Sequence, residues 1–184
     1  PGKAAIIPRR ILVVGQFAIS ILLISATIIV YNQIQHVKDR NMGYNPNNLI
    51  MMPNNAELYD NYGVIKQELM KTGMIAGVTR SLSPITAIWW RSGAPDYEGK
   101  PENANIIMCG QTTDTDYFTT MGIKLLEGRD FTGTPADSAH MILNKTAVKV
   151  MGLKKPVGMQ MRQGSRTFTV IGIADDVVMS SPFT

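Results

Sequence analysis

Residues 11–30 form an uninterrupted run of twenty residues without a charge, directly after Arg9 and Arg10. As an α-helix this run would be about 30 Å long, which matches the hydrocarbon core of a bilayer. Thirteen of its residues are Ile, Leu, Val or Phe, and they outweigh its few polar side chains. A buried core helix is seldom apolar on every face at this length, and a secretory signal has a shorter apolar run. The sequence therefore predicts a transmembrane helix over residues 11–31.

The placement of the charged residues argues against a nucleic-acid partner. The net charge is +4, but three of the 18 basic residues precede the apolar run, and the remaining 15 nearly balance the 14 acidic residues. The basic residues before the run predict, by the positive-inside tendency, that residues 1–10 are cytoplasmic and that residues 32–184 lie outside the cytoplasm. Lys38 and Arg40 reduce this contrast.

The single cysteine, the chain length and the first residue place few limits on the fold of this chain. Cys109 has no partner for a disulfide within the chain, which fits a domain stabilised by its core in either compartment. The roughly 150 residues after the run suffice for one sizeable core or two small lobes. Because the chain begins with Pro1 rather than Met, we expect an internal fragment of a longer protein.

The segment after the membrane is predicted to be a stalk over residues 32–46. The helix is expected to continue to about Arg40, with Ile34 and Val37 as its apolar stripe, until Gly43 and Pro46 break it. Gly43 can adopt a positive φ that is closed to most residues, so it is a candidate stalk hinge.

The remaining chain, residues 47–184, is predicted to mix helices and strands. One helix is expected over residues 56–71, with an asparagine N-cap and an apolar face. That face consists of Leu58, Tyr62, Ile65 and Leu69. Shorter helices are expected at 117–121, capped by Asp116, and at 145–151. Strands are expected at 49–52, 78–83, 104–111 (buried), 124–127, 141–143, 158–162 and 167–174. Without a regular βαβ period, this order predicts an α+β fold.

The sequence contains no recognisable catalytic or metal-binding set. His36 and His140 are its only histidines, and it has no HExxH, CxxC, GxSxG, Ser-x-x-Lys or phosphate-binding glycine loop. Asp175 and Asp176 are interpreted as a solvated exit from the last strand, because adjacent side chains on a strand point apart. We therefore predict no enzyme activity, no cofactor, no metal, and neither catalytic nor cofactor-binding residues.

Trp89 and Trp90 lie in a long irregular stretch, residues 84–103, and they allow two interpretations. An exposed aromatic pair could contact an apolar substrate, a partner protein or lipid, which makes this stretch a candidate interaction loop. Such a pair more often fixes a long loop to its own domain, and the sequence favours that structural role.

The run YFTTMGIKLLEGRDF at residues 117–131 is specific enough to be compared with known families. Shorter runs accompany it at residues 10–17, 42–45, 97–100, 142–147, 151–153, 156–158 and 168–176. Together they resemble the periplasmic core domain of MacB-like permeases, in the FtsX/MacB superfamily of ABC transporters. Lys145 departs from the family pattern, where an acidic residue is common, and this affects surface charge rather than fold.

The resemblance implies a two-lobed core domain at residues 47–184, C-terminally incomplete, with a porter-like α+β lobe and a β-rich lobe. It implies a permease subunit in the bacterial inner membrane, whose periplasmic domain is coupled to ATP hydrolysis by mechanotransmission. The implied partners are a cytoplasmic ABC ATPase subunit and membrane lipid, with a periplasmic adaptor or a second permease copy as further candidates. The alternative from another class is the ligand-sensing ectodomain of a membrane-anchored receptor.

Overall fold

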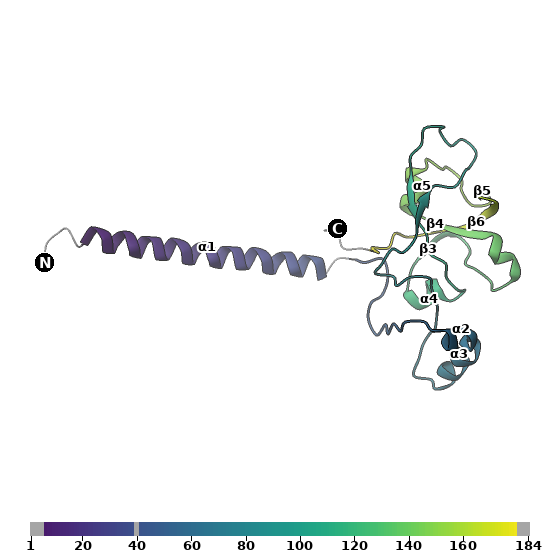
Figure 1. Ribbon diagram of the computed structural model, residues 1–184, viewed down its shortest axis with the longest axis horizontal. Coiled ribbons are helices and arrows are strands. Elements are labelled where there is room, and N and C mark those ends of the chain that lie inside the picture. Colours follow the sequence, from purple (N-terminus) through teal and green to yellow (C-terminus); the bar gives the residue numbers. More distant parts are fainter. Residues whose placement is uncertain (1–5, 39–40, 180–184) are drawn as a thin grey trace. The chain divides into compact units, whose positions relative to one another are not determined.

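The computed structural model describes residues 6–38 and 41–179. The chain divides into two compact units, Pro1–Asn41 and Met42–Thr184, and each is described here by itself. Elements of both units are labelled in Figure 1.

The first unit is built on one long helix, α1 (Ile6–Lys38, 33 residues). Within the described residues, α1 is the one helix long and apolar enough to cross a membrane, over Pro8–His36, and that stretch has no buried side chains. Two of its hydroxyls donate hydrogen bonds inside the helix, Ser20 Oγ to the Gln16 carbonyl at 2.9 Å and Thr27 Oγ1 to the Leu23 carbonyl at 2.8 Å. These bonds lower the cost of placing hydroxyls in an apolar medium.

The predicted apolar helix is therefore confirmed, and it continues without a break past residue 31. Its expected end near Arg40 falls outside the described residues, as does the side chain of Val37.

The second unit begins with irregular chain and a helix pair. The predicted strand at 49–52 is wrong: this segment has no regular structure, and Ile50 is 86% exposed. The predicted helix over 56–71 is present as α2 (Ala56–Asp60) and α3 (Tyr62–Lys71), with an interruption at Asn61. Asn55 caps α2 by accepting a hydrogen bond from the Leu58 amide.

The predicted apolar face of this helix pair is confirmed in its position. Its four residues are partly buried, whereas most other positions of α2 and α3 are exposed. Neither helix contains a fully buried residue. The pair lies at the end of the unit away from α5 (Figure 1).

A short antiparallel ribbon follows, formed by β1 (Arg91–Gly93) and β2 (Ile107–Cys109). The predicted strand at 78–83 is wrong, because the structure has only an isolated bridge there, between Ser81 and Thr113. The predicted strand at 104–111 is reduced to β2 and is not buried. Ile107 is 69% exposed, since one face of the ribbon meets solvent.

The centre of the unit is a four-stranded sheet around β6 (Arg166–Ala174). Its other strands are β3 (Leu125–Gly128), β4 (His140–Asn144) and β5 (Gln160–Gln163). Both β3 and β5 pair with β6 in the antiparallel sense, and β4 pairs with it in parallel. The remaining elements are α4 (Tyr117–Met121), the 3-10 helix η2 (Pro135–Ala139) and α5 (Lys145–Val150). The predicted elements from residue 117 onward are thus confirmed to within about two residues.

Apolar side chains of this unit gather in two clusters. The first consists of Ile85, Tyr117, Met121, Ile123 and Ala174. The second consists of Leu143, Ala147, Met151, Met161 and Val170. Strand β6 contributes to both, through Ala174 and Val170, so it connects the two halves of the core. The predicted α+β class with an N-terminal apolar helix is confirmed.

Candidate functional site

The backbone of residues 42–45 is held closely against the segment that follows β6. We call residues 42–45 together with residues 175–178 the joint. Gly43 has φ +76°, and a Cβ atom built on it would lie 2.0 Å from the carbonyl oxygen of Asp176. The Val178 amide donates a hydrogen bond to the Met42 carbonyl at 2.9 Å. Gly43 thus has the positive φ that glycine allows at this position, and the close approach requires glycine for a second, independent reason.

The joint is also bonded to the core of the second unit. The Asn45 amide donates to the Met121 carbonyl at 2.8 Å, and the Asp175 amide donates to the Lys124 carbonyl at 2.8 Å. The side chains of Tyr44 and Val177 pack against the first apolar cluster. A displacement of residues 42–45 would therefore strain backbone hydrogen bonds and apolar packing together.

The sequence led us to expect that the Asp176 carboxylate faces water. In the structure it has protein partners instead. It accepts hydrogen bonds from Asn144 Nδ2 at 2.8 Å, the Thr146 amide at 2.9 Å and Thr146 Oγ1 at 2.8 Å. The parallel pairing of β4 and β6 brings Asn144 opposite Ala174, so Asp176 reaches the start of α5. Sequence reasoning missed this contact because it depends on which strands pair.

Trp89 and Trp90 have different surroundings. A Cβ atom at Gly110 would lie 1.9 Å from Cζ3 of Trp90, so this indole lies directly against the Gly110 backbone. The Gly110 amide also donates to the Trp90 carbonyl at 3.2 Å. Trp90 is 41% exposed and Trp89 is 67% exposed, and neither belongs to an apolar cluster. Trp90 thus fixes its loop to the ribbon, whereas Trp89 presents its ring to the surroundings.

A polar cluster attaches the helix pair to the rest of the unit. Lys66 on α3 forms an ion pair with Asp116 and lies 3.5 Å from Asp114 Oδ2. Asp114 also accepts hydrogen bonds from the hydroxyls of Tyr62 and Thr79. Asp116 occupies the N-cap position of α4, but its side chain makes no capping bond there. The predicted capping role of Asp116 is therefore wrong, because its carboxylate pairs with Lys66 instead.

Burial and charge shift the titration of this cluster. Burial of the Tyr62 phenol, together with its hydrogen bond to Asp114, raises the pKa of Tyr62 to about 12. Burial of Lys66 lowers the pKa of its ammonium, but the Asp116 hydrogen bond and the Asp114 charge outweigh this, so the pKa is raised. The Arg80 guanidinium lies 4.7 Å from the ring centroid of Tyr62. These groups neutralise one another, which indicates a structural attachment rather than a reactive site.

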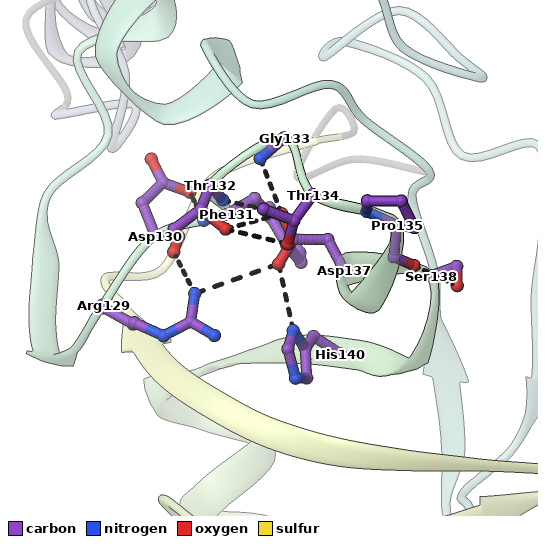
Figure 2. A network of polar contacts seen from close by, with 10 residues as sticks. All are labelled: Arg129, Asp130, Phe131, Thr132, Gly133, Thr134, Pro135, Asp137, Ser138 and His140. Carbon is purple, nitrogen blue, oxygen red and sulfur yellow. Dashed lines mark hydrogen bonds and ion pairs between the residues drawn. The ribbon is translucent and has the colours of Figure 1, made fainter.

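A second polar network closes the connection between β3 and β4, and Figure 2 shows Asp137 at its centre. Its carboxylate accepts hydrogen bonds from the amides of Thr132 and Gly133, each at 2.7 Å. It lies 3.0 Å from His140 Nδ1 and 3.9 Å from Arg129 Nη1. The hydrogen bond with His140, and then the two amides, lower the pKa of Asp137 to about 2. The network is satisfied within its own loop, so it fixes the loop shape.

Within the described part of the chain, no group of three or more His, Cys, Asp or Glu side chains could hold a metal ion. The joint lies within the second unit and ties residues 42–45 to the segment after β6. In the sequence it comes shortly after a helix long enough to span a bilayer.

These features define a class of protein in which an apolar helix, long enough to span a membrane, precedes an α+β domain in the sequence. Residues 12–184 match the model of the MacB-like periplasmic core domain, and the chain belongs to this family. This confirms the resemblance to MacB/FtsX-like ABC transporter permeases that the sequence motifs indicated.

Solved structures of related domains are similar to this chain. The periplasmic region of MacB from Actinobacillus actinomycetemcomitans is 23% identical, with a TM-score of 0.42; the match covers 62% of this chain and 50% of that one. The extracellular domain of the noncanonic ABC-type transporter YknZ from Gram-positive bacteria is 18% identical, with a TM-score of 0.36 and coverages of 70% and 67%. The chain thus spans about half of the MacB periplasmic region. Among curated proteins, none matches.

Proposed function

We propose that this chain is part of an ABC transporter permease in the bacterial inner membrane. Residues 1–10 would be cytoplasmic, residues 11–31 would span the membrane, residues 32–46 would form the stalk, and residues 47–184 would belong to the periplasmic core domain. Family membership supports this proposal, and it favours a transporter over the receptor alternative.

In this proposal the core domain performs no chemistry. A cytoplasmic ATPase subunit hydrolyses ATP, its conformational change moves α1, and the joint passes that movement to the α+β unit. The result is export or another task in the cell envelope. The observation that carries this step is the fixed backbone of Gly43 against Asp176. A joint with few alternative conformations transmits a displacement, whereas a flexible linker would absorb it.

The candidate interaction loop has a separate role in this proposal. Trp89 is 67% exposed, and Ile107 on the neighbouring strand is 69% exposed. Large apolar side chains in this position favour contact with a protein partner, such as a periplasmic adaptor or a second permease copy.

The test uses the complete permease, reconstituted in lipid nanodiscs with its ATPase subunit. Hydrogen exchange of residues 42–45 and 175–178 is compared between the nucleotide-free complex and the complex trapped with ATP and vanadate. We expect exchange at the joint to change on trapping, and to stay constant when the ATPase carries a mutation that blocks ATP binding. Failure of the two subunits to co-purify, or identical exchange in the two states, would contradict the proposal.

A further inference from the structure

We infer that Asp176 is a positioning residue that ties the joint to the start of α5, so that a displacement at Gly43 is passed to the second apolar cluster. The purpose of such a tie rests on the function proposed above. The tie itself is a property of the second unit, and it can be measured without any ATPase.

The main chain of Asp176 contacts the joint. Its carbonyl oxygen occupies the space beside Gly43, where a Cβ atom would come within 2.0 Å. Two residues later, the Val178 amide bonds to the Met42 carbonyl at 2.9 Å. Residues 42 and 43 therefore cannot move toward this segment without pushing it.

The side chain of Asp176 reaches in another direction, to the end of β4 and the start of α5. Its two carboxylate oxygens accept three hydrogen bonds from Asn144 and Thr146, all between 2.8 and 2.9 Å. A carboxylate that accepts several hydrogen bonds holds its donors in a defined geometry, because bonds to a charged acceptor are stronger than neutral ones.

Ordinary helix capping does not account for this arrangement. Helix α5 already has an N-cap in Asn144, whose Oδ1 accepts from the Ala147 amide at 3.0 Å. The Asp176 carboxylate comes from a segment 30 residues away from Thr146 in sequence. It therefore adds a long-range link to a helix start that is capped locally.

The buried side of α5 packs in the second apolar cluster. Ala147 on α5 and Met151 directly after it are 9% and 6% exposed, and both belong to the second cluster with Met161 and Val170. Tyr97 donates a hydrogen bond from its hydroxyl to the Met151 carbonyl at 3.1 Å. A shift of the start of α5 would thus alter both this cluster and the chain around Tyr97, because α5 has only six residues.

The test measures amide hydrogen exchange in the full chain, held in nanodiscs without an ATPase. The reporter peptides cover residues 42–45 and 145–153. Four proteins are compared: the parent chain, Gly43→Ala, Asp176→Ala and the double variant. In the parent background we expect Gly43→Ala to raise exchange in 145–153 by about threefold or more. In the Asp176→Ala background the same substitution should change only residues 42–45.

Two further variants separate the tie from general destabilisation. Thr146→Val removes the hydroxyl donor and should weaken the response of 145–153, whereas Thr146→Ser keeps that donor and should preserve it. Asp96→Asn is the matched control, because its carboxylate pairs with Lys100 and Arg162 and not with α5. If Asp176→Ala does not fold, the Thr146 pair carries the comparison.

The inference is overturned if Gly43→Ala leaves 145–153 unchanged while it alters 42–45. It is equally overturned if the response is the same with and without Asp176 or the Thr146 hydroxyl. The tie would be retained, and the proposed function rejected, if Gly43→Ala raised exchange in 145–153 only when Asp176 is present while ATP and vanadate caused no change at the joint. Failure of the tie can therefore be distinguished from failure of the proposed function.

Discussion

The carbonyl oxygen of Asp176 occupies the space that any side chain on Gly43 would need, with 2.0 Å between this oxygen and an ideal Cβ position. The two residues are far apart in sequence, yet they meet at the point where the chain enters the α+β unit. Gly43 is thus constrained twice, by its φ of +76° and by the neighbouring backbone. This argues against a freely flexible linker at this position.

Replacing Gly43 with alanine should destabilise the joint. Gly99→Ala is the matched control, because Gly99 also has a positive φ, +83°, but nothing lies within 4 Å of its Cβ position. Both substitutions carry backbone strain of about 1–3 kcal/mol. We expect a lower melting temperature for Gly43→Ala than for Gly99→Ala, because only Gly43→Ala adds the clash.

In the complete transporter, Gly43→Ala should impair transport while binding of the ATPase subunit is retained. Complementation of the deletion phenotype and co-purification of the ATPase measure the two properties. Full complementation at normal expression, with the same melting temperature as Gly99→Ala, would show that the joint tolerates distortion.

Cys109 offers a direct test of orientation. It is the single cysteine of the sequence, and it is exposed on β2. If residues 32–184 lie outside the cytoplasm, a membrane-impermeant maleimide should label Cys109 in intact spheroplasts to the same extent as after lysis. Cys109→Ser provides the background. Labelling that requires lysis would reverse the predicted orientation.

Removal of the Lys66 charge should loosen the helix pair. Lys66→Met removes the cation that pairs with Asp114 and Asp116, and the Lys66 side chain is only 24% exposed. We therefore expect the free energy of unfolding to fall by about 1 kcal/mol and hydrogen exchange in α3 to become faster. Lys71→Met is the control, since Lys71 pairs with Glu68 on the same helix and both side chains are more than 60% exposed. Equal effects of the two substitutions would show that the cluster does not attach the helices.

Stability should depend on Asp137 in acid. Its pKa of about 2 in the folded chain lies below the ordinary unfolded value of about 3.9. The folded state therefore releases this proton more readily, and the stabilisation is fully present above about pH 4 and is lost as the pH falls toward 2. Asp137→Asn should lower the free energy of unfolding at pH 7 by about 1–2 kcal/mol, and the melting temperature should fall with it.

Melting curves of the parent and of Asp137→Asn between pH 7 and pH 2.5 measure this dependence. The difference between the two proteins should shrink below pH 4. A difference that stays constant over the whole range would show that the Asp137 charge does not stabilise the loop.

Local patterns were sufficient to predict many elements of this protein. The uncharged run at 11–30 predicted α1, because an apolar helix satisfies its backbone hydrogen bonds within itself. The helices and strands after residue 117 were also predicted, since their caps, glycines and apolar spacing lie within a few residues of one another. Strands at 49–52 and 78–83 were predicted wrongly, because a strand forms only where a partner strand meets it.

The sequence by itself determined the helix long enough to span a membrane, the α+β class and the glycine at position 43, all of which depend on neighbouring residues. The tertiary structure decided what those residues contact. In the folded chain, Asp176 lies beside Gly43 and Thr146. Asp116 pairs with Lys66 instead of capping its own helix. Trp89 stays exposed, whereas Trp90 lies against Gly110. These contacts join segments distant in sequence, and they form because β6 pairs with both β3 and β4, which no local pattern specifies.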